Sequence, residues 1–384
     1  MISSDLGLWS RRGFVQSLSA TALGSWGLAQ AQELGSVVRL GQSTALTGPL
    51  GDLGQAMHQG AKLYFDIVNA KGGVNGRKIE LVTQDDGYDV KRALANVEGF
   101  LADKDTFALF NCMGTPMIEA MLPKVMAAGT PFFAPFTGAL LARTKSRNVF
   151  NIRASYPDEA EQLVQHLATI GIKRIGIAYQ NNTFGKEVFE GARLAMEKHQ
   201  ISGTTAVTVE SSGADAAEAA ARLVAASPEA VLVGLAGKPT LDFVKAMRQI
   251  RRGMPLYALS VMGSAATLQA LGDDAVGIAV SQVVPLPTSG GVPIAREFVQ
   301  AWKQAGVALE PSHLALEGYI NARVFAEALR RAGAKPTRES FIDATWALRR
   351  WDLGGFEVSA SEPGRNASKF VELTMVARQG RFIR

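Results

Sequence analysis

The sequence has few of the residues on which metal and redox chemistry depend. It contains one cysteine, Cys112, and four histidines among 384 residues. A single thiol excludes a disulfide within the chain and a thiolate metal cluster. The histidines show no metal-ligand spacing such as His-Glu-x-x-His. We therefore expect neither a metal nor a cofactor.

A strong net charge and long apolar runs are missing as well. Lys and Arg number 40 against 35 Asp and Glu, and the net charge of +5 is too small and too scattered to predict a nucleic-acid partner. After residue 31, no segment reaches the roughly 18 consecutive apolar residues of a membrane span. The Gly-x-Ser-x-Gly elbow and the Gly-Lys-Ser/Thr phosphate loop are absent, so the sequence predicts a binding protein and not an enzyme. An exported α/β hydrolase or ligand-modifying enzyme is the alternative, and it would need a nucleophile–base pair that we do not find.

Residues 1–31 have the three parts of an export signal. Arg11 and Arg12 precede Phe14, a mildly apolar stretch follows, and Ala29-Gln30-Ala31 provides a small-residue cleavage site. The paired arginines resemble a twin-arginine signal. A disordered or amphipathic N-terminal tail is the alternative interpretation. We expect the mature protein in the periplasm.

From Val37 onward, short apolar runs alternate with helical periodicity, which predicts an α/β fold with mostly parallel sheets. The order restarts after Tyr156. The expected strands are 37–41, 78–83, 107–110, 174–179, 206–209, 230–233, 256–259 and 371–375, and the expected helices are 55–69, 90–102, 117–128, 159–169, 186–199, 214–225, 240–250, 294–304, 316–331 and 340–348.

The length predicts two lobes, because single cores stop growing at roughly 250–300 residues. The Pro-rich piece 284–291 interrupts the second run, and the helices that follow it have no strands of their own. We expect an N-terminal lobe and a C-terminal lobe, each doubly wound, joined by a hinge of several crossings with a ligand cleft between them. Their expected bounds are 36–154 plus 286–352 and 155–285 plus 353–384.

Several motifs resemble the solute-binding proteins of branched-chain amino-acid-type ABC transporters. They are Leu46-Thr47-Gly48-Pro49, Asn69 to Arg77 with its Gly-Gly-Val-Asn-Gly turn, Asp85-Asp86, Phe184-Gly185, Gln282–Pro285 and Leu316-Glu317-Gly318-Tyr319. The resemblance covers nearly all of residues 36–384. It implies a type I periplasmic binding protein, monomeric, that closes on a small molecule and presents it to an ABC permease in the inner membrane.

Two of these motifs also have a local structural reading. Asn75-Gly76 suits a tight hairpin turn that needs positive φ. Asp85 and Asp86 end an expected strand, where acidic side chains order loops, although ligands also gather at the carboxyl ends of parallel strands.

The loop from Asn111 to Pro116 follows an expected strand and precedes an expected helix. Thr115 is a good N-cap, Pro116 suits the first helical position, and Gly114 permits close approach of backbone. Backbone N–H groups and a hydroxyl would then face the cleft, which predicts a receptor for a carboxylate or a phosphate. A plain capped helix is the alternative. The resemblance implies that this loop holds the ligand carboxylate.

The resemblance implies further ligand contacts on both lobes. The segment from Ala134 to Gly138 would supply a backbone carbonyl and a hydroxyl, with Thr137 as the hydroxyl, while Phe136 either walls the pocket or packs in the core. Phe184 would cover the ligand. Leu53, Ala236 and Val261 stand where related proteins carry other ligand-contacting side chains. The full expected set is Leu53, Met113, Gly114, Thr115, Ala134, Phe136, Thr137, Phe184, Ala236 and Val261.

The loop Ser260–Ser264 departs from the pattern of amino-acid binders, which place a glutamate there for the ligand's ammonium group. No acid occurs from Leu256 to Leu271. A desolvated ammonium without a partner costs several kcal/mol, so we expect a carboxylate with an apolar or aromatic body.

Two alternatives to this interpretation stay open. An amino acid would fit if Asp85, Asp86 or Glu317 supplied the missing charge. A sensor without transport would use the same hinge closure. In either case we expect the closed form to be stabilised only through contacts with the ligand.

Overall fold

The computed structural model describes residues 1, 37–201, 205–308 and 310–384. Residues 37–384 form one compact unit, distinct from the segment 1–36. Apart from Met1, the predicted export signal lies outside the described residues. Within the described part of the chain, no helix is long and apolar enough to cross a membrane.

The first sheet has the strand order β2-β1-β3-β4-β5, and all of its pairs are parallel. Its strands are β1 (Val38–Thr44), β2 (Ile79–Asp85), β3 (Thr106–Phe110), β4 (Phe132–Phe133) and β5 (Val149–Phe150). The helices between them are α1 (Gly51–Ala70), α2 (Val90–Ala102) and α3 (Thr115–Ala128). Separate buried clusters lie on the two faces of the sheet: Phe110 belongs to one and its neighbour Leu109 to the other. Apolar burial on both faces is what a doubly wound parallel sheet requires.

The second sheet has the order β14-β13-β10-β9-β8-β6-β7. It is parallel from β6 to β10, and β13 and β14 add antiparallel edge strands from the end of the chain. Its strands are β6 (Ile175–Gln180), β7 (Thr205–Val209), β8 (Ala230–Gly234), β9 (Leu256–Ala258), β10 (Ala279–Gln282), β13 (Glu372–Val376) and β14 (Phe382–Ile383). Its helices are α4 (Tyr156–Thr169), α5 (Thr183–Lys198), α6 (Ala216–Ala225), α7 (Lys238–Ile250) and α8 (Ala265–Leu271). The predicted α/β class with mostly parallel sheets is confirmed.

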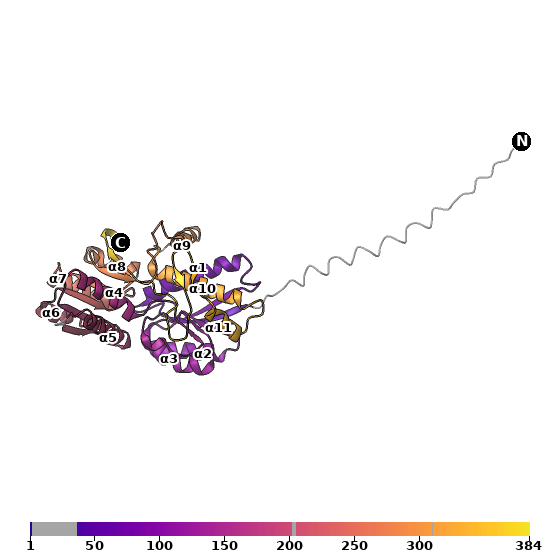
Figure 1. Ribbon diagram of the computed structural model, residues 1–384, viewed down its shortest axis with the longest axis horizontal. Coiled ribbons are helices and arrows are strands. Elements are labelled where there is room, and N and C mark those ends of the chain that lie inside the picture. The colour runs from indigo at the N-terminus through magenta and orange to yellow at the C-terminus, as the bar shows by residue number, and fades with distance from the viewer. Residues whose placement is uncertain (2–36, 202–204, 309) are drawn as a thin grey trace. The chain divides into compact units, whose positions relative to one another are not determined.

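Three later helices, α9 (Pro293–Gln304), α10 (His313–Arg331) and α11 (Arg338–Trp346), share the core of the first sheet (Figure 1). Phe325 of α10 packs edge-on against Phe110 and Phe133, with ring centroids 5.8 and 5.2 Å apart. The segment after α11 pairs β11 (Trp351–Asp352) with β12 (Glu357–Val358). Its Phe356 packs in this same core before the chain reaches β13.

Two chain segments run side by side between the sheets. The backbone N–H groups of Ala367 and Ser368 donate to the carbonyls of Asn151 and Ile152, at 2.8 Å each. Arg143 fastens this crossing, because its Nε donates to Asn366 at 2.8 Å and its Nη2 to the carbonyl of Arg153 at 3.1 Å. The chain passes from one sheet to the other at these two segments and again at residues 282–293.

The predicted helix positions hold, but several starts fall earlier than the apolar spacing indicated. Helix α4 begins at Tyr156 instead of Glu159, and α5 at Thr183 instead of Lys186. The first turn of a helix is defined by its cap: Ser155 forms a capping box with Asp158, and Asn182 accepts from the N–H of Gly185. Apolar periodicity does not register these polar first turns.

The hairpin turn is confirmed. Val74 and Arg77 form an antiparallel bridge, and Asn75 and Gly76 between them have φ of 50° and 79°. Both values are positive, as a type I′ turn requires.

Candidate ligand-binding site

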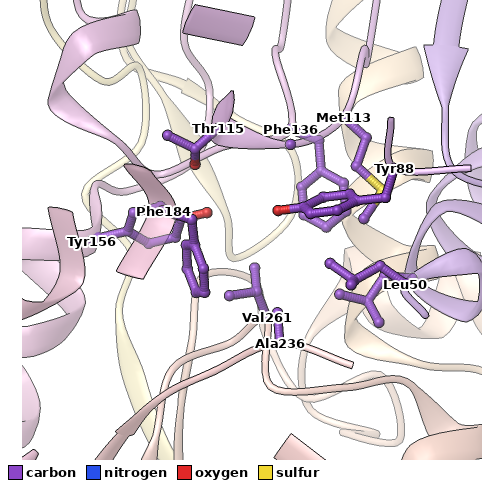
Figure 2. Close-up of a pocket in the computed structure, with 11 residues that line it drawn as sticks. Leu50, Tyr88, Met113, Thr115, Phe136, Tyr156, Phe184, Ala236 and Val261 are labelled. Atoms are coloured by element: carbon purple, nitrogen blue, oxygen red, sulfur yellow. The ribbon is translucent and has the colours of Figure 1, made fainter. Parts of the chain in front are cut away.

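A small cavity lies where loops from both sheets meet, at the carboxyl ends of the strands. Figure 2 shows its lining side chains. They are Leu50, Leu53, Tyr88, Met113, Gly114, Thr115, Phe136, Tyr156, Phe184, Ala236 and Val261. The first sheet and its helices supply those up to Phe136, and the second sheet and its helices supply the others.

Eight of the ten residues expected at the site line this cavity, and two do not. Ala134 is buried in the core of the first sheet, where its backbone N–H donates to the carbonyl of Phe150. Thr137 is fully buried behind the lining, and its hydroxyl bonds to that of Thr115, which does line the cavity. Phe136, whose two readings were left open, both lines the cavity and belongs to a buried cluster.

The expected N-cap at Thr115 is wrong. Gly114, with φ of 96°, is the N-cap of α3, and Thr115 is already the first helical residue. Its hydroxyl therefore does not cap the helix but pairs with the hydroxyl of Thr137 at 2.8 Å, which in turn accepts from the N–H of Ala139. Among the described residues, nothing accepts a hydrogen bond from the backbone N–H of Thr115 or Met117. Of these two residues only Thr115 lines the cavity, so the start of α3 offers one open N–H donor and a hydroxyl there.

Three lining residues were not expected from the sequence: Leu50, Tyr88 and Tyr156. Tyr156 stands at the first position of α4, with its ring centroid 5.2 Å from that of Phe184. Gly138 makes room for it, because a Cβ there would lie 2.5 Å from the Tyr156 ring. Sequence position gave a weak signal, since Tyr88 follows the Asp85-Asp86 pair and Tyr156 opens the second run of elements.

The two acids at the end of β2, Asp85 and Asp86, order the loop that follows, as predicted. Asp85 accepts from the N–H groups of Leu46 and Gly87 and from the hydroxyl of Thr47, and these bonds, led by the hydroxyl, hold its pKa far below the ordinary value. Asp86 is buried, which raises its pKa, although Ser43 and the N–H of Tyr88 donate to it. Neither carboxylate lines the cavity.

Glu317, the third acid considered, also stays out of the cavity. It lies buried with its Oε1 3.5 Å from Nη1 of Arg153. Burial alone would lower the pKa of Arg153, but the charges of Glu317 and Glu159 leave it raised. The Arg153 guanidinium lies 5.5 Å from the centroid of the Phe136 ring, so it sits behind the cavity wall.

The loop that lacks the expected glutamate is held by a different acid. Glu159 of α4 accepts from the N–H of Ser260 at 2.9 Å and from the Ser281 hydroxyl at 2.7 Å. Its other oxygen accepts from Arg153 at 3.0 Å. This carboxylate is therefore buried, neutralised and occupied, and it offers nothing to a ligand ammonium group.

Direct hydrogen bonds join the two sides of the cavity. Asp52 of α1 accepts from the hydroxyl of Ser264, the N-cap of α8, at 2.5 Å and from that of Thr267 within α8 at 2.8 Å. The backbone N–H of Lys238 donates to the carbonyl of Pro49 at 3.1 Å. The two sides of the cavity are therefore joined by hydrogen bonds of the protein itself.

This close approach depends on a glycine. Gly237 has φ of 61°, and a Cβ at that position would lie 2.5 Å from the carbonyl oxygen of Pro49.

Two sheets that surround a small, mostly apolar cavity with donors at a helix start define a small-molecule-binding protein. The family model described as periplasmic binding protein matches residues 37–380. A substrate-binding periplasmic protein from Ralstonia solanacearum is 33% identical, with a TM-score of 0.83 over 90% of this chain and 99% of that one. The Leu/Ile/Val-binding protein homolog 7 of Brucella suis is 23% identical over 82% of this chain and 81% of its own length. A solute-binding protein of an ABC transporter from R. palustris, solved with benzoate, shares the fold at 18% identity, with a TM-score of 0.81 over 91% of this chain and 95% of that one.

The chain belongs to the periplasmic binding protein family, with the type I fold of the branched-chain amino-acid type, and is a substrate-binding protein of the kind that serves ABC transporters.

Proposed function

We propose that this protein binds a small monocarboxylate with an aromatic or aliphatic body and no α-amino group. One observation carries the proposal: the cavity combines donors at the start of α3 with apolar walls, and no Asp or Glu is among its lining residues. A carboxylate gains charge-assisted hydrogen bonds from such donors, each contributing about 1.5–3 kcal/mol. An ammonium group would lose its hydration without gaining a partner.

The lining of the cavity narrows the ligand class. Phe136, Phe184 and Val261 are apolar, so they favour an aromatic or aliphatic body over a polar one. The benzoate complex of the R. palustris protein supports benzoate as the first probe, since benzoate combines one carboxylate with a compact apolar body.

The mechanism that we propose is a clamp. The two lobes, 36–154 plus 286–352 and 155–285 plus 353–384, would open and close about the crossings near Asn151. The ligand carboxylate would bind at the start of α3, and Phe184, Ala236 and Val261 would close over its body. An ABC permease in the inner membrane would then take the ligand from the closed form. We further propose that the protein acts in the periplasm as a monomer, after removal of residues 1–31, and that it does not alter its ligand chemically.

A branched-chain amino acid is the second candidate, favoured by the Leu/Ile/Val-binding relatives. It would need an acid at the cavity, and Asp85, Asp86 and Glu317 do not line it. A sensor without transport would bind the same ligand, and a partner permease captured by the closed form would distinguish transport from sensing.

The test is native mass spectrometry of protein purified without denaturation, followed by calorimetric titration. The panel contains benzoate, phenylacetate, 4-methyl-2-oxopentanoate and L-leucine. We expect binding of at least one of the three acids without an amino group and weaker binding of leucine. Tighter binding of leucine, which has the same carbon skeleton as the oxo acid, would overturn the proposal in favour of the amino acid. Binding of none of the panel by an otherwise folded protein would overturn both.

A further inference from the structure

Tyr88 has an unusual backbone for a large side chain. Its φ is 63°, in the left-handed region that residues with a Cβ rarely adopt. The loop that follows β2 fixes this conformation: Asp86 accepts from the N–H of Tyr88 at 2.9 Å, and Asp85 accepts from the N–H of Gly87 at 2.9 Å. Asp86 is itself held by the Ser43 hydroxyl at 2.7 Å. Strained backbone that its surroundings fix so firmly is typical of functional positions.

The start of α3 is shaped around the Tyr88 ring. Gly114 has φ of 96°, and a Cβ built there would lie 2.9 Å from Cε2 of Tyr88. The ring packs between two buried clusters, one around Met113 and one around Met117. The side chain is therefore confined to one position, with its ring along the cavity wall.

The Tyr88 hydroxyl faces the cavity. Figure 2 shows the hydroxyls of Tyr88 and Tyr156 pointing toward each other from opposite sides, with Thr115 nearby. Burial raises the pKa of the Tyr88 phenol, and a hydrogen bond with the Asn182 side chain offsets part of that rise. The group is thus a neutral phenol at physiological pH, able to donate a hydrogen bond to an anion.

We propose that Tyr88 determines the specificity of the candidate site by donating its phenol hydroxyl to the carboxylate of the bound ligand. This inference rests on the proposed function. A phenol opposite a second phenol can satisfy both oxygens of a carboxylate, whereas a methyl ester presents weaker acceptors and a methyl group in the same space. Tyr88 would therefore select the acid over its ester.

The test compares Tyr88→Phe, which keeps the ring and removes the hydroxyl, with Tyr179→Phe as the matched control. Tyr179 lies outside the cavity and stacks on Phe189 with ring centroids 4.9 Å apart. The probes are the acid of the panel that binds the wild-type protein most tightly and the methyl ester of that acid. We expect Tyr88→Phe to weaken binding of the acid about 10- to 100-fold, as loss of a charge-assisted hydrogen bond does. Binding of the ester should change by less than about 3-fold, because a neutral acceptor gains little from the phenol.

Equal loss of the acid and the ester, or no loss of either, would overturn the role of Tyr88 and leave the proposed function standing. A wild-type protein that binds no acid of the panel would overturn the proposed function and this inference with it. The melting temperature of Tyr88→Phe shows whether the variant folds. If it does not fold, Tyr156→Phe is measured with the same two probes in its place. Equal binding of the acid by Tyr156→Phe and the wild type would overturn the claim that the two phenols bind the carboxylate together.

Discussion

The two walls of the cavity differ in what they offer a ligand. The wall from the first sheet carries the open N–H and the hydroxyl of Thr115 at the start of α3, together with the Tyr88 phenol. The wall from the second sheet is mostly apolar: Phe184, Ala236 and Val261 contribute no charge, and Tyr156 contributes its only side-chain hydroxyl. We infer that the first wall, with the Tyr156 hydroxyl opposite it, recognises the head group of the ligand and that the apolar side chains of the second wall exclude water from its body. Four predictions follow from this difference between the two walls, ordered from the largest expected effect to the smallest.

A charge placed on the apolar wall should reverse the preference of the site. Val261→Glu puts a carboxylate where the ligand body would lie, and like charges in a desolvated site cost several kcal/mol, so acid binding should fall by about 100-fold or more. L-leucine should gain affinity, because its ammonium group gains a partner. Val261→Gln is the control of similar size without the charge. Calorimetry that shows the same losses for both variants would contradict the electrostatic explanation.

Removal of a hydroxyl from the wall of the first sheet should weaken binding of the acid less than Val261→Glu does. Thr115→Ala deletes the side chain that pairs with Thr137, and we expect an affinity about 10-fold lower, near the lower end for a hydrogen bond to a charged group. Cys112→Ser is the control, since Cys112 is buried in the neighbouring core and does not line the cavity. Equal affinities of the two variants by titration calorimetry would remove Thr115 from the recognition wall.

Low pH should lower the stability of the fold before it affects ligand binding. Burial, and then the charge of Arg384, lower the pKa of His313 from 6.5 to about 3. Below pH 6.5 the unfolded chain binds a proton at His313 and the folded protein does not. The free energy of unfolding therefore has its full value above pH 6.5 and decreases as the pH falls from 6.5 toward 3. At pH 5 the loss should be roughly 2 kcal/mol.

Denaturant titrations at pH 7 and pH 5 measure this loss, and His313→Asn should reduce it. An equal loss in the variant would assign the pH dependence to other groups. The affinity of the folded protein for its carboxylate ligand should change little between pH 7 and pH 5, because no histidine, Asp or Glu lines the cavity.

The smallest effect should come from the bonds that join the two walls. Asp52→Ala removes the acceptor for Ser264 and Thr267, and we expect affinity to fall about 3- to 10-fold because the partly exposed bonds favour the closed form only modestly. Asp66→Ala, on the same helix but on the surface and paired with Lys62, is the control. Spin-label distances across the cavity should lengthen without ligand for Asp52→Ala alone. Distances that match the control would show that these bonds do not hold the lobes together.

Local sequence predicted those parts of the site that depend on local chemistry. Gly114 and Thr115 follow a buried strand and begin a helix, so both could be placed from their neighbours along the chain. Phe184 was placed by the resemblance to the solute-binding proteins. The role of Thr115 could not, because it depends on Thr137 from another loop. Tyr88 was missed because its direction depends on a left-handed backbone and on space left by Gly114, 26 residues further on in the sequence and far outside any local pattern.

The order of polar and apolar residues along the chain by itself determined the alternating strands and helices, the tight turn at Asn75-Gly76 and the absence of an acid between Leu256 and Leu271. These features depend on backbone preferences and residue types within a few positions of one another. Only the tertiary structure decided that Glu159 turns its carboxylate to Arg153 and Ser260, away from the cavity, and that Asp52 bonds across it. Side chains distant in sequence find their partners only when packing brings their elements together, so the electrostatic character of the cavity is a property of the folded chain.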